Sequence, residues 1–149
     1  KGSAALTNKT PTSVDEAKFS LPVIIALTLL HGNITDRELR VDIRNHPEVQ
    51  TIAAKVNIIE DAEISAAFPK LRSTEFDIIF KDGEKFTKYV DAPIGMPENP
   101  VSWHDMETKF RNASHAFLQK TTPEVILSSV KNIDKKSSVL DLMQQFGQS

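Results

Sequence analysis

Cysteine is absent from this 149-residue sequence, which excludes disulfides, thiolate nucleophiles and zinc sites built on cysteine. The sequence also has no large excess of positive or of negative charge. The 18 basic and 20 acidic residues leave a formal net charge of -2, which gives no general attraction to nucleic acid or to an anionic membrane. The longest apolar run, residues 21–30, is about half of the roughly 20 residues that span a bilayer. We therefore expect a cytoplasmic protein with no membrane span and no nucleic-acid partner.

Catalytic motifs are missing as well. The sequence contains no GxSxG, no phosphate-binding glycine loop and no HExxH or HxH pair. We interpret the dispersed histidines as structural or surface residues: these are His31, His46, His104 and His115. The residues alone thus predict no catalytic group, no metal site and no cofactor. The chain starts at Lys1 rather than at methionine, and we expect it to be a piece of a longer polypeptide.

The most informative stretch that is present is residues 16–32, where a charged segment leads into an almost unbroken apolar run. Only Pro22 and Thr28 interrupt the aliphatic residues between positions 21 and 30. A helix that is apolar on every side must be buried on every side, which a small domain rarely achieves alone. Gly32 predicts the end of this helix, because glycine readily takes the left-handed conformation that closes a last turn.

Further helices are predicted from capping residues and from apolar residues that recur every three or four positions. Ser13 with Glu16 predicts a short helix over residues 13–20, and Thr35 with Glu38 predicts two turns over residues 36–43. The remaining predicted helices cover residues 45–56, with Val49 and Ala53 on the buried face, residues 102–118, with Trp103 as a core anchor, residues 122–133 and residues 138–146.

The periodicity changes to that of strands between residues 56 and 91. Residues 56–60 predict a short strand, and residues 74–91 predict a β-hairpin around Lys81-Asp82-Gly83. A three-residue turn there, which we expect, puts five large apolar residues on one face: Phe76, Ile78, Phe80, Phe86 and Val90. The fold class is therefore α+β, with an antiparallel β-sheet built on this hairpin, packed with helices and followed by C-terminal helices. Residues 1–12 are predicted as an extended arm or linker, and residues 13–149 as one domain.

Lys18 stands apart from the other charged residues, because it lies between a capping acid and the apolar helix. It is therefore expected at the edge of whatever covers that helix, where a cation can meet a carboxylate substrate. The alternative is a lysine whose stem packs on the surface while its ammonium group reaches water. The sequence leaves both interpretations open.

Several motifs also occur in a specific order along the chain. They are Thr10-Pro11-Thr12, Glu16-Ala17-Lys18-Phe19-Ser20-Leu21-Pro22, His46-Pro47-Glu48-Val49, Lys81-Asp82-Gly83, Gly95-Met96-Pro97-Glu98-Asn99-Pro100-Val101-Ser102-Trp103 and Glu107-Thr108-Lys109-Phe110-Arg111. In this order they resemble the C-terminal domain of the MmgE/PrpD family, over nearly the whole chain. Each motif is weak by itself, whereas the ordered set is specific.

The resemblance implies an activity and partners. Family members include 2-methylcitrate dehydratase, cis-aconitate decarboxylase and iminodisuccinate epimerase, which act on small di- and tricarboxylates by proton transfer without a metal or organic cofactor. They are typically homodimers, with the active site between a large N-terminal helical domain and a smaller α+β domain. The resemblance makes this chain one wall of that cleft, with Lys18, Ser20 and Val23 as its substrate-binding residues. Most catalytic residues of the family belong to the other domain, so this chain alone is expected to be inactive.

Val23 departs from the family pattern, because many relatives carry a tyrosine there. Loss of the phenol removes a hydrogen-bond donor and an acidic proton, which weakens the case for a dehydratase. Dehydration, decarboxylation and epimerisation all remain open. The alternative outside the enzymes is a free-standing α+β interaction module, whose apolar helix is wholly covered by its own fold.

Overall fold

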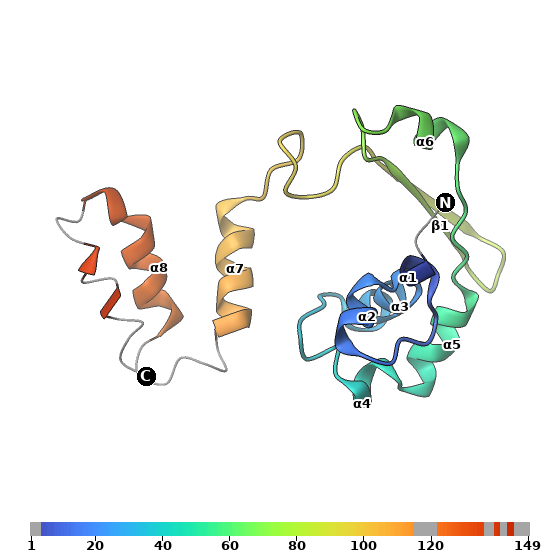
Figure 1. Cartoon of the computed structure of the whole chain (residues 1–149), viewed down its shortest axis with the longest axis horizontal. Coiled ribbons are helices and arrows are strands. Elements are labelled where there is room, and N and C mark those ends of the chain that lie inside the picture. Colours follow the sequence, from blue (N-terminus) through green and yellow to red (C-terminus); the bar gives the residue numbers. More distant parts are fainter. Residues whose placement is uncertain (1–3, 115–121, 136–138, 141–142, 145–149) are drawn as a thin grey trace. The chain divides into compact units, whose positions relative to one another are not determined.

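The computed structural model describes residues 4–114, 122–135, 139–140 and 143–144. The chain divides into two compact units, Lys1–Asp91 and Ala92–Ser149, and each is described by itself. The first unit contains helices α1 to α6 and a hairpin of strands β1 and β2, and the second contains α7, α8 and a short 3-10 helix (Figure 1). Helices and an antiparallel two-stranded sheet together confirm the predicted α+β class.

Helices α2 (Val14–Phe19) and α3 (Leu21–His31) follow the predicted boundaries. The Ser20 hydroxyl starts α3 by accepting a hydrogen bond from the Val23 N–H at 3.2 Å, and proline lies in the first turn. Gly32 ends the helix at φ 78°, where its N–H donates to the Thr28 carbonyl at 2.8 Å. Both ends of α3 are therefore set by residues within a turn of them.

The start of α2 differs slightly from a capping box. The Ser13 hydroxyl accepts from the Glu16 N–H at 3.1 Å, as that motif requires. The Glu16 carboxylate reaches one residue further back, where it accepts from the Thr12 N–H at 2.7 Å and from the Thr12 hydroxyl at 2.9 Å. These bonds, first the one from the Thr12 backbone, hold the pKa of Glu16 below its ordinary value.

An extended arm is predicted over residues 1–12, and its described part, residues 4–12, is more structured than that. It includes helix α1 (Ala4–Thr7), and hydrogen bonds hold the segment after it to the rest of the first unit. The Lys9 ammonium donates to the Ala54 carbonyl at 2.7 Å, and the Arg44 guanidinium donates to the Thr12 carbonyl at 2.9 Å. Arg44 is only 4% exposed and also donates to the Leu39 carbonyl at 2.8 Å. This buried arginine therefore joins two distant loops.

The core of the first unit lies where α2 and α5 (Pro47–Lys55) pack against α3 (Figure 1). Its buried apolar residues are Ala17, Val23, Ala26, Leu27, Leu39, Val49 and Ala53. One flank of α3 is covered by this core. On the other flank, Leu21 is 39% exposed and Leu29 is 52% exposed. The complete burial that an all-apolar helix requires is thus not reached in the part of the chain that the structure describes.

The predicted two-turn helix over residues 36–43 is wrong. Residues 36–39 form a turn, and only α4 (Val41–Arg44) is helical. The Thr35 N–H and hydroxyl both donate to the Glu38 carboxylate, at 2.8 and 2.5 Å, and the Thr35 hydroxyl accepts from the Arg37 N–H at 3.2 Å. Local side-chain bonds of this kind compete with helix formation and stabilise a turn instead.

The hairpin consists of β1 (Thr74–Ile79) and β2 (Lys85–Val90). Ile78 pairs with Phe86, and the Phe80 N–H donates to the Glu84 carbonyl at 2.8 Å, which leaves residues 81–83 as the turn. Gly83 has φ 90°. This register confirms the three-residue turn and the five apolar residues on one face. β2 is exposed along its whole length.

The predicted strand over residues 56–60 is wrong. The segment is an irregular connection between α5 and α6 (Ala62–Ala67), and Ile58 and Ile59 are 43% and 84% exposed. β-branched residues favour a strand only where a neighbouring strand can pair with them. The sheet formed by the described residues has the order β1-β2 and offers this segment no partner.

In the second unit, α7 (Trp103–Ser114) starts where predicted, with the Ser102 hydroxyl accepting from the Asp105 N–H at 3.1 Å. Its apolar stripe is not covered by the described residues of this unit: Trp103 is 54% exposed and Met106 is 48% exposed. Trp103 is therefore not a core anchor there. Helix α8 (Pro123–Lys131) and the 3-10 helix Ile133–Lys135 follow. The predicted end of α7 at residue 118 and most of the predicted helix over residues 138–146 lie outside the described residues.

Candidate functional site

The three residues predicted to bind substrate lie together at the junction of α2 and α3, but they differ in accessibility. Ser20 and Val23 are fully buried. The Ser20 hydroxyl is occupied twice, because it donates to the Asn8 carbonyl and accepts from the Val23 N–H. The Lys18 side chain is 48% exposed, and its ammonium group lies 3.9 Å from a carboxylate oxygen of Asp15.

The junction can therefore supply one cation to a ligand. The Asp15 side chain is 91% exposed, and an ion pair at such a surface contributes about 0–1 kcal/mol, so an incoming carboxylate can replace Asp15 at low cost. Ser20 and Val23 support this position from inside: one anchors the first turn of α3, and the other packs in the core. A substrate contact by any of the three stays a prediction.

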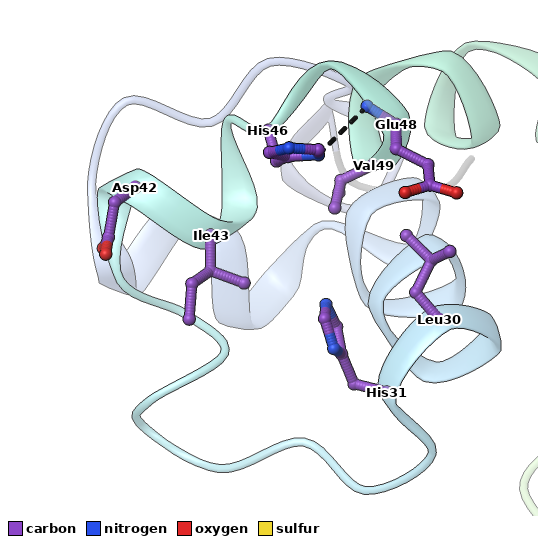
Figure 2. A pocket seen from close by; sticks show the side chains of 7 residues that line it. All are labelled: Leu30, His31, Asp42, Ile43, His46, Glu48 and Val49. Atoms are coloured by element: carbon purple, nitrogen blue, oxygen red, sulfur yellow. Dashed lines mark hydrogen bonds between the residues drawn. The ribbon is translucent and has the colours of Figure 1, made fainter.

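A second group of functional side chains was not predicted from the sequence. A pocket of about 280 Å³ lies between the end of α3, α4 and the start of α5. Its lining consists of Leu30, His31, Asp42, Ile43, His46, Glu48 and Val49 (Figure 2). In that view the His31 ring points from the end of α3 toward the middle of the pocket, while Asp42 and Glu48 lie at its opposite ends.

The local sequence explains each histidine separately but not their convergence. His31 is the last residue of α3, and His46 precedes α5, where its Nδ1 accepts from the Glu48 N–H at 3.4 Å. These are the structural roles that the sequence predicts. The packing of α5 against α3 then brings both rings to one pocket. Nothing in the spacing of the two residues signals this, because it arises from tertiary structure.

The second unit contains the most strongly paired carboxylate of the described residues. Glu107 is 9% exposed and forms ion pairs with Lys131 and, at 3.2 Å, with Arg111. Arg111 also contacts Glu124 of α8 at 3.2 Å. The hydrogen bond from Lys131, followed by that from Arg111, holds the pKa of Glu107 below its ordinary value. Because its oxygens are occupied by cations, Glu107 acts as a connection between α7 and α8 rather than as a proton acceptor.

Neither a metal-binding cluster nor a membrane-spanning helix is present within the described ranges. No group of three or more histidine, cysteine, aspartate or glutamate residues is placed to hold a metal ion there. Among the same residues, no helix has the length and apolar character needed to cross a membrane.

Comparison with known proteins identifies the family. The sequence matches the MmgE/PrpD C-terminal domain over residues 2–135. It is 30% identical over 124 residues to cis-aconitate decarboxylase of Homo sapiens and 29% identical over 124 residues to the Mus musculus protein of that name. Each alignment covers 83% of this chain but only 26% and 25% of the two relatives, so the chain spans about a quarter of their length. As its ordered motifs indicate, the chain belongs to the MmgE/PrpD family, of which residues 2–135 are a C-terminal domain.

Proposed function

We propose that this chain forms one wall of the active-site cleft of a lyase or isomerase that acts on a small di- or tricarboxylate without a cofactor. The observation that carries the proposal is the family match over residues 2–135. The similarity to two cis-aconitate decarboxylases makes decarboxylation of cis-aconitate the first reaction to test. The partners that we propose are an N-terminal helical domain of the same protein and a second copy of that protein in a homodimer.

The flank of α3 that the described residues leave uncovered supports the need for another domain. Leu21 and Leu29 are exposed on a helix whose opposite side is a packed core, and Phe19, just before it, is 61% exposed. At about 25 cal/mol per Å² of buried apolar surface, covering such side chains contributes substantially to domain association. We infer that this flank packs against the N-terminal helical domain.

Lys18 is the residue that we propose to contact the substrate. It is the exposed cation at the α2–α3 junction, and its weak partner Asp15 leaves the ammonium group available. A carboxylate bound there gains a charge-assisted hydrogen bond. The chain contributes binding and orientation in this proposal, and groups of the other domain carry out proton transfer.

The test uses the longer protein that contains this chain. Its Lys18→Ala variant is expected to raise KM for cis-aconitate by about tenfold, which corresponds to roughly 1.4 kcal/mol of lost binding. Lys18→Arg should retain much of the affinity, and Lys88→Ala in exposed β2 is the matched control for removal of a surface lysine. Unchanged KM and kcat in Lys18→Ala would support the alternative, in which the Lys18 ammonium group reaches water and does not contact the substrate.

The isolated 149-residue chain provides a second test. It is expected to release no CO2 from cis-aconitate, because general acid–base catalysis needs a group held within hydrogen-bond reach of the reacting atoms. It is also expected to self-associate or to bind a hydrophobic dye through the uncovered flank of α3. Turnover by the isolated chain would overturn the cleft-wall proposal. A strictly monomeric chain that binds no dye would favour the free-standing interaction module.

A further inference from the structure

We propose that the pocket between α3, α4 and α5 binds a small organic cation, an ammonium group carried on a short aromatic or aliphatic body. This proposal does not depend on the proposed enzymatic function. It is carried by three features of the lining residues: an apolar floor, an excess of negative charge, and imidazole rings between the charges.

The floor of the pocket suits the body of such a ligand. Leu30, Ile43 and Val49 line it, and Val49 is 1% exposed and belongs to the core of the first unit. The volume of about 280 Å³ lies just below the range of roughly 300–1,000 Å³ that is typical of small-molecule sites. The ligand is therefore small, of the size of one aromatic ring with a short substituent.

The charges favour a cation. Asp42 and Glu48 lie at opposite ends of the pocket (Figure 2). Asp42 is already paired with Arg40 at 3.3 Å, whereas no described residue forms an ion pair or side-chain hydrogen bond with the Glu48 carboxylate. Glu48 is thus the group that an ammonium ion can pair with. The C-terminal end of the 11-residue helix α3 also faces this space and carries a partial negative charge.

The ring of His46 does not oppose this assignment. His46 Nδ1 accepts a hydrogen bond from the Glu48 N–H at 3.4 Å, so this ring nitrogen is already occupied within the protein. The same bond occupies a donor at the start of α5, which would otherwise attract an anion. A polycarboxylate is disfavoured in this pocket because it would face Asp42 and Glu48 together.

The test compares three probes of the same shape and different charge: benzylamine, benzyl alcohol and benzoate. Each is titrated at neutral pH into the isotope-labelled 149-residue chain, and binding is followed by the backbone amide signals. Benzylamine, protonated at this pH, should shift the signals of Leu30, Ile43 and Val49, with about fivefold higher affinity than benzyl alcohol, which is the upper end for one surface ion pair. Benzoate should not bind at this pocket.

Two variants show whether the charge and the pocket are responsible. Glu48→Gln should weaken benzylamine binding to the level of benzyl alcohol, whereas Glu63→Gln, in the exposed first turn of α6, should leave it unchanged. Ile43→Phe fills the pocket and should abolish the shifts for every probe, which provides a test even if Glu48→Gln disturbs α5. Equal binding of benzylamine and benzyl alcohol, tighter binding of benzoate, or less than a twofold effect of Glu48→Gln would overturn the proposal.

Discussion

Replacement of Leu27 by alanine is the most direct test of how α3 is packed. Leu27 is fully buried and is the largest of the fully buried side chains in the first unit. Several of its neighbours in the cluster are alanines, whose single methyl group cannot move far enough to fill the vacated space. The substitution is therefore expected to leave a cavity that the surrounding core fills only partly.

The magnitude follows from the burial. Leucine to alanine removes three carbon atoms, and at about 0.8 kcal/mol for each buried CH₂ the transfer contribution is about 2.4 kcal/mol. A cavity adds to this, and fully buried Leu→Ala substitutions cost about 2–5 kcal/mol in all. We expect a loss of about 3 kcal/mol in the free energy of unfolding of the first unit, which is a large part of the roughly 5–15 kcal/mol of an ordinary domain.

Leu29→Ala on the same helix is the matched control. Leu29 is 52% exposed, so about half of the transfer contribution, or roughly 1 kcal/mol, is expected to be lost, and no cavity forms. The change in helix propensity is the same for both variants. Urea unfolding, followed by the amide signals of α3 and α5, measures the first unit alone. With a slope of about 1–3 kcal/mol per molar urea, the two midpoints should differ by about 1 M.

Equal losses in the two variants would refute the reasoning. Such a result would mean that the flank carrying Leu29 is covered in solution, and unfolding at several protein concentrations would show whether a second copy covers it. A loss below about 1 kcal/mol for Leu27→Ala would mean instead that the described core is not the one that stabilises the unit.

Three further predictions concern other parts of the chain. Gly83→Ala should destabilise the hairpin by about 1–2 kcal/mol, as measured from its amide signals in urea. A new Cβ at this position meets no atom within 4 Å, so the cost comes only from the strained φ of 90°. An unchanged urea dependence of these signals would contradict this prediction. Thr35→Val should raise the pKa of Glu38 toward 4.5 in an NMR titration, because the hydroxyl bond is the main cause of its lowered pKa. Since the pKa of Glu38 is lower in the folded chain, the stability that its hydrogen bonds contribute is present above about pH 4.5 and is lost as the pH falls through the folded pKa. An unchanged pKa of Glu38 in the Thr35→Val variant would exclude the hydroxyl bond as the cause. Arg44→Met should cost about 2–4 kcal/mol in urea unfolding, because it removes the donors to two backbone carbonyls, and Arg44→Lys should not restore the loss, because one ammonium group cannot reproduce the arginine fork.

The parts of the fold that the sequence predicted are those set by neighbouring residues. Ser20 and Gly32 determine the two ends of α3 within one turn, and Gly83 determines the hairpin register through a three-residue turn. The strand expected over residues 56–60 failed because a strand needs a pairing partner, which no local pattern provides. The stripe of α7 was recognised as apolar, but periodicity shows only which face is apolar and not what covers it.

The candidate sites could likewise be predicted only where neighbouring residues determine them. Lys18 could be placed at the α2–α3 junction from the sequence, because capping residues and an apolar run define that junction. The burial of Ser20 could not be predicted from the sequence, because its hydroxyl bonds to the carbonyl of Asn8, twelve positions earlier in the chain. The pocket could not either, because His31 and His46 meet only through the packing of α5 against α3.

Ionic strength should act in two directions on the second unit. Helices α7 and α8 of this unit are joined by charged contacts between Glu107 and Lys131 and between Arg111 and Glu124, while Trp103 and Met106 are exposed among the described residues. Added salt shortens the screening length from about 10 Å at 0.1 M to about 3 Å at 1 M. It therefore weakens the more exposed Arg111–Glu124 pair most, whereas the pair between Lys131 and the 11% exposed Glu107 side chain is screened less. Sulfate at high concentration also strengthens the burial of apolar surface. Sodium chloride should therefore weaken the contact between α7 and α8. Sodium sulfate should have the same effect on the ion pairs and should also favour burial of the apolar stripe of α7 against another apolar surface.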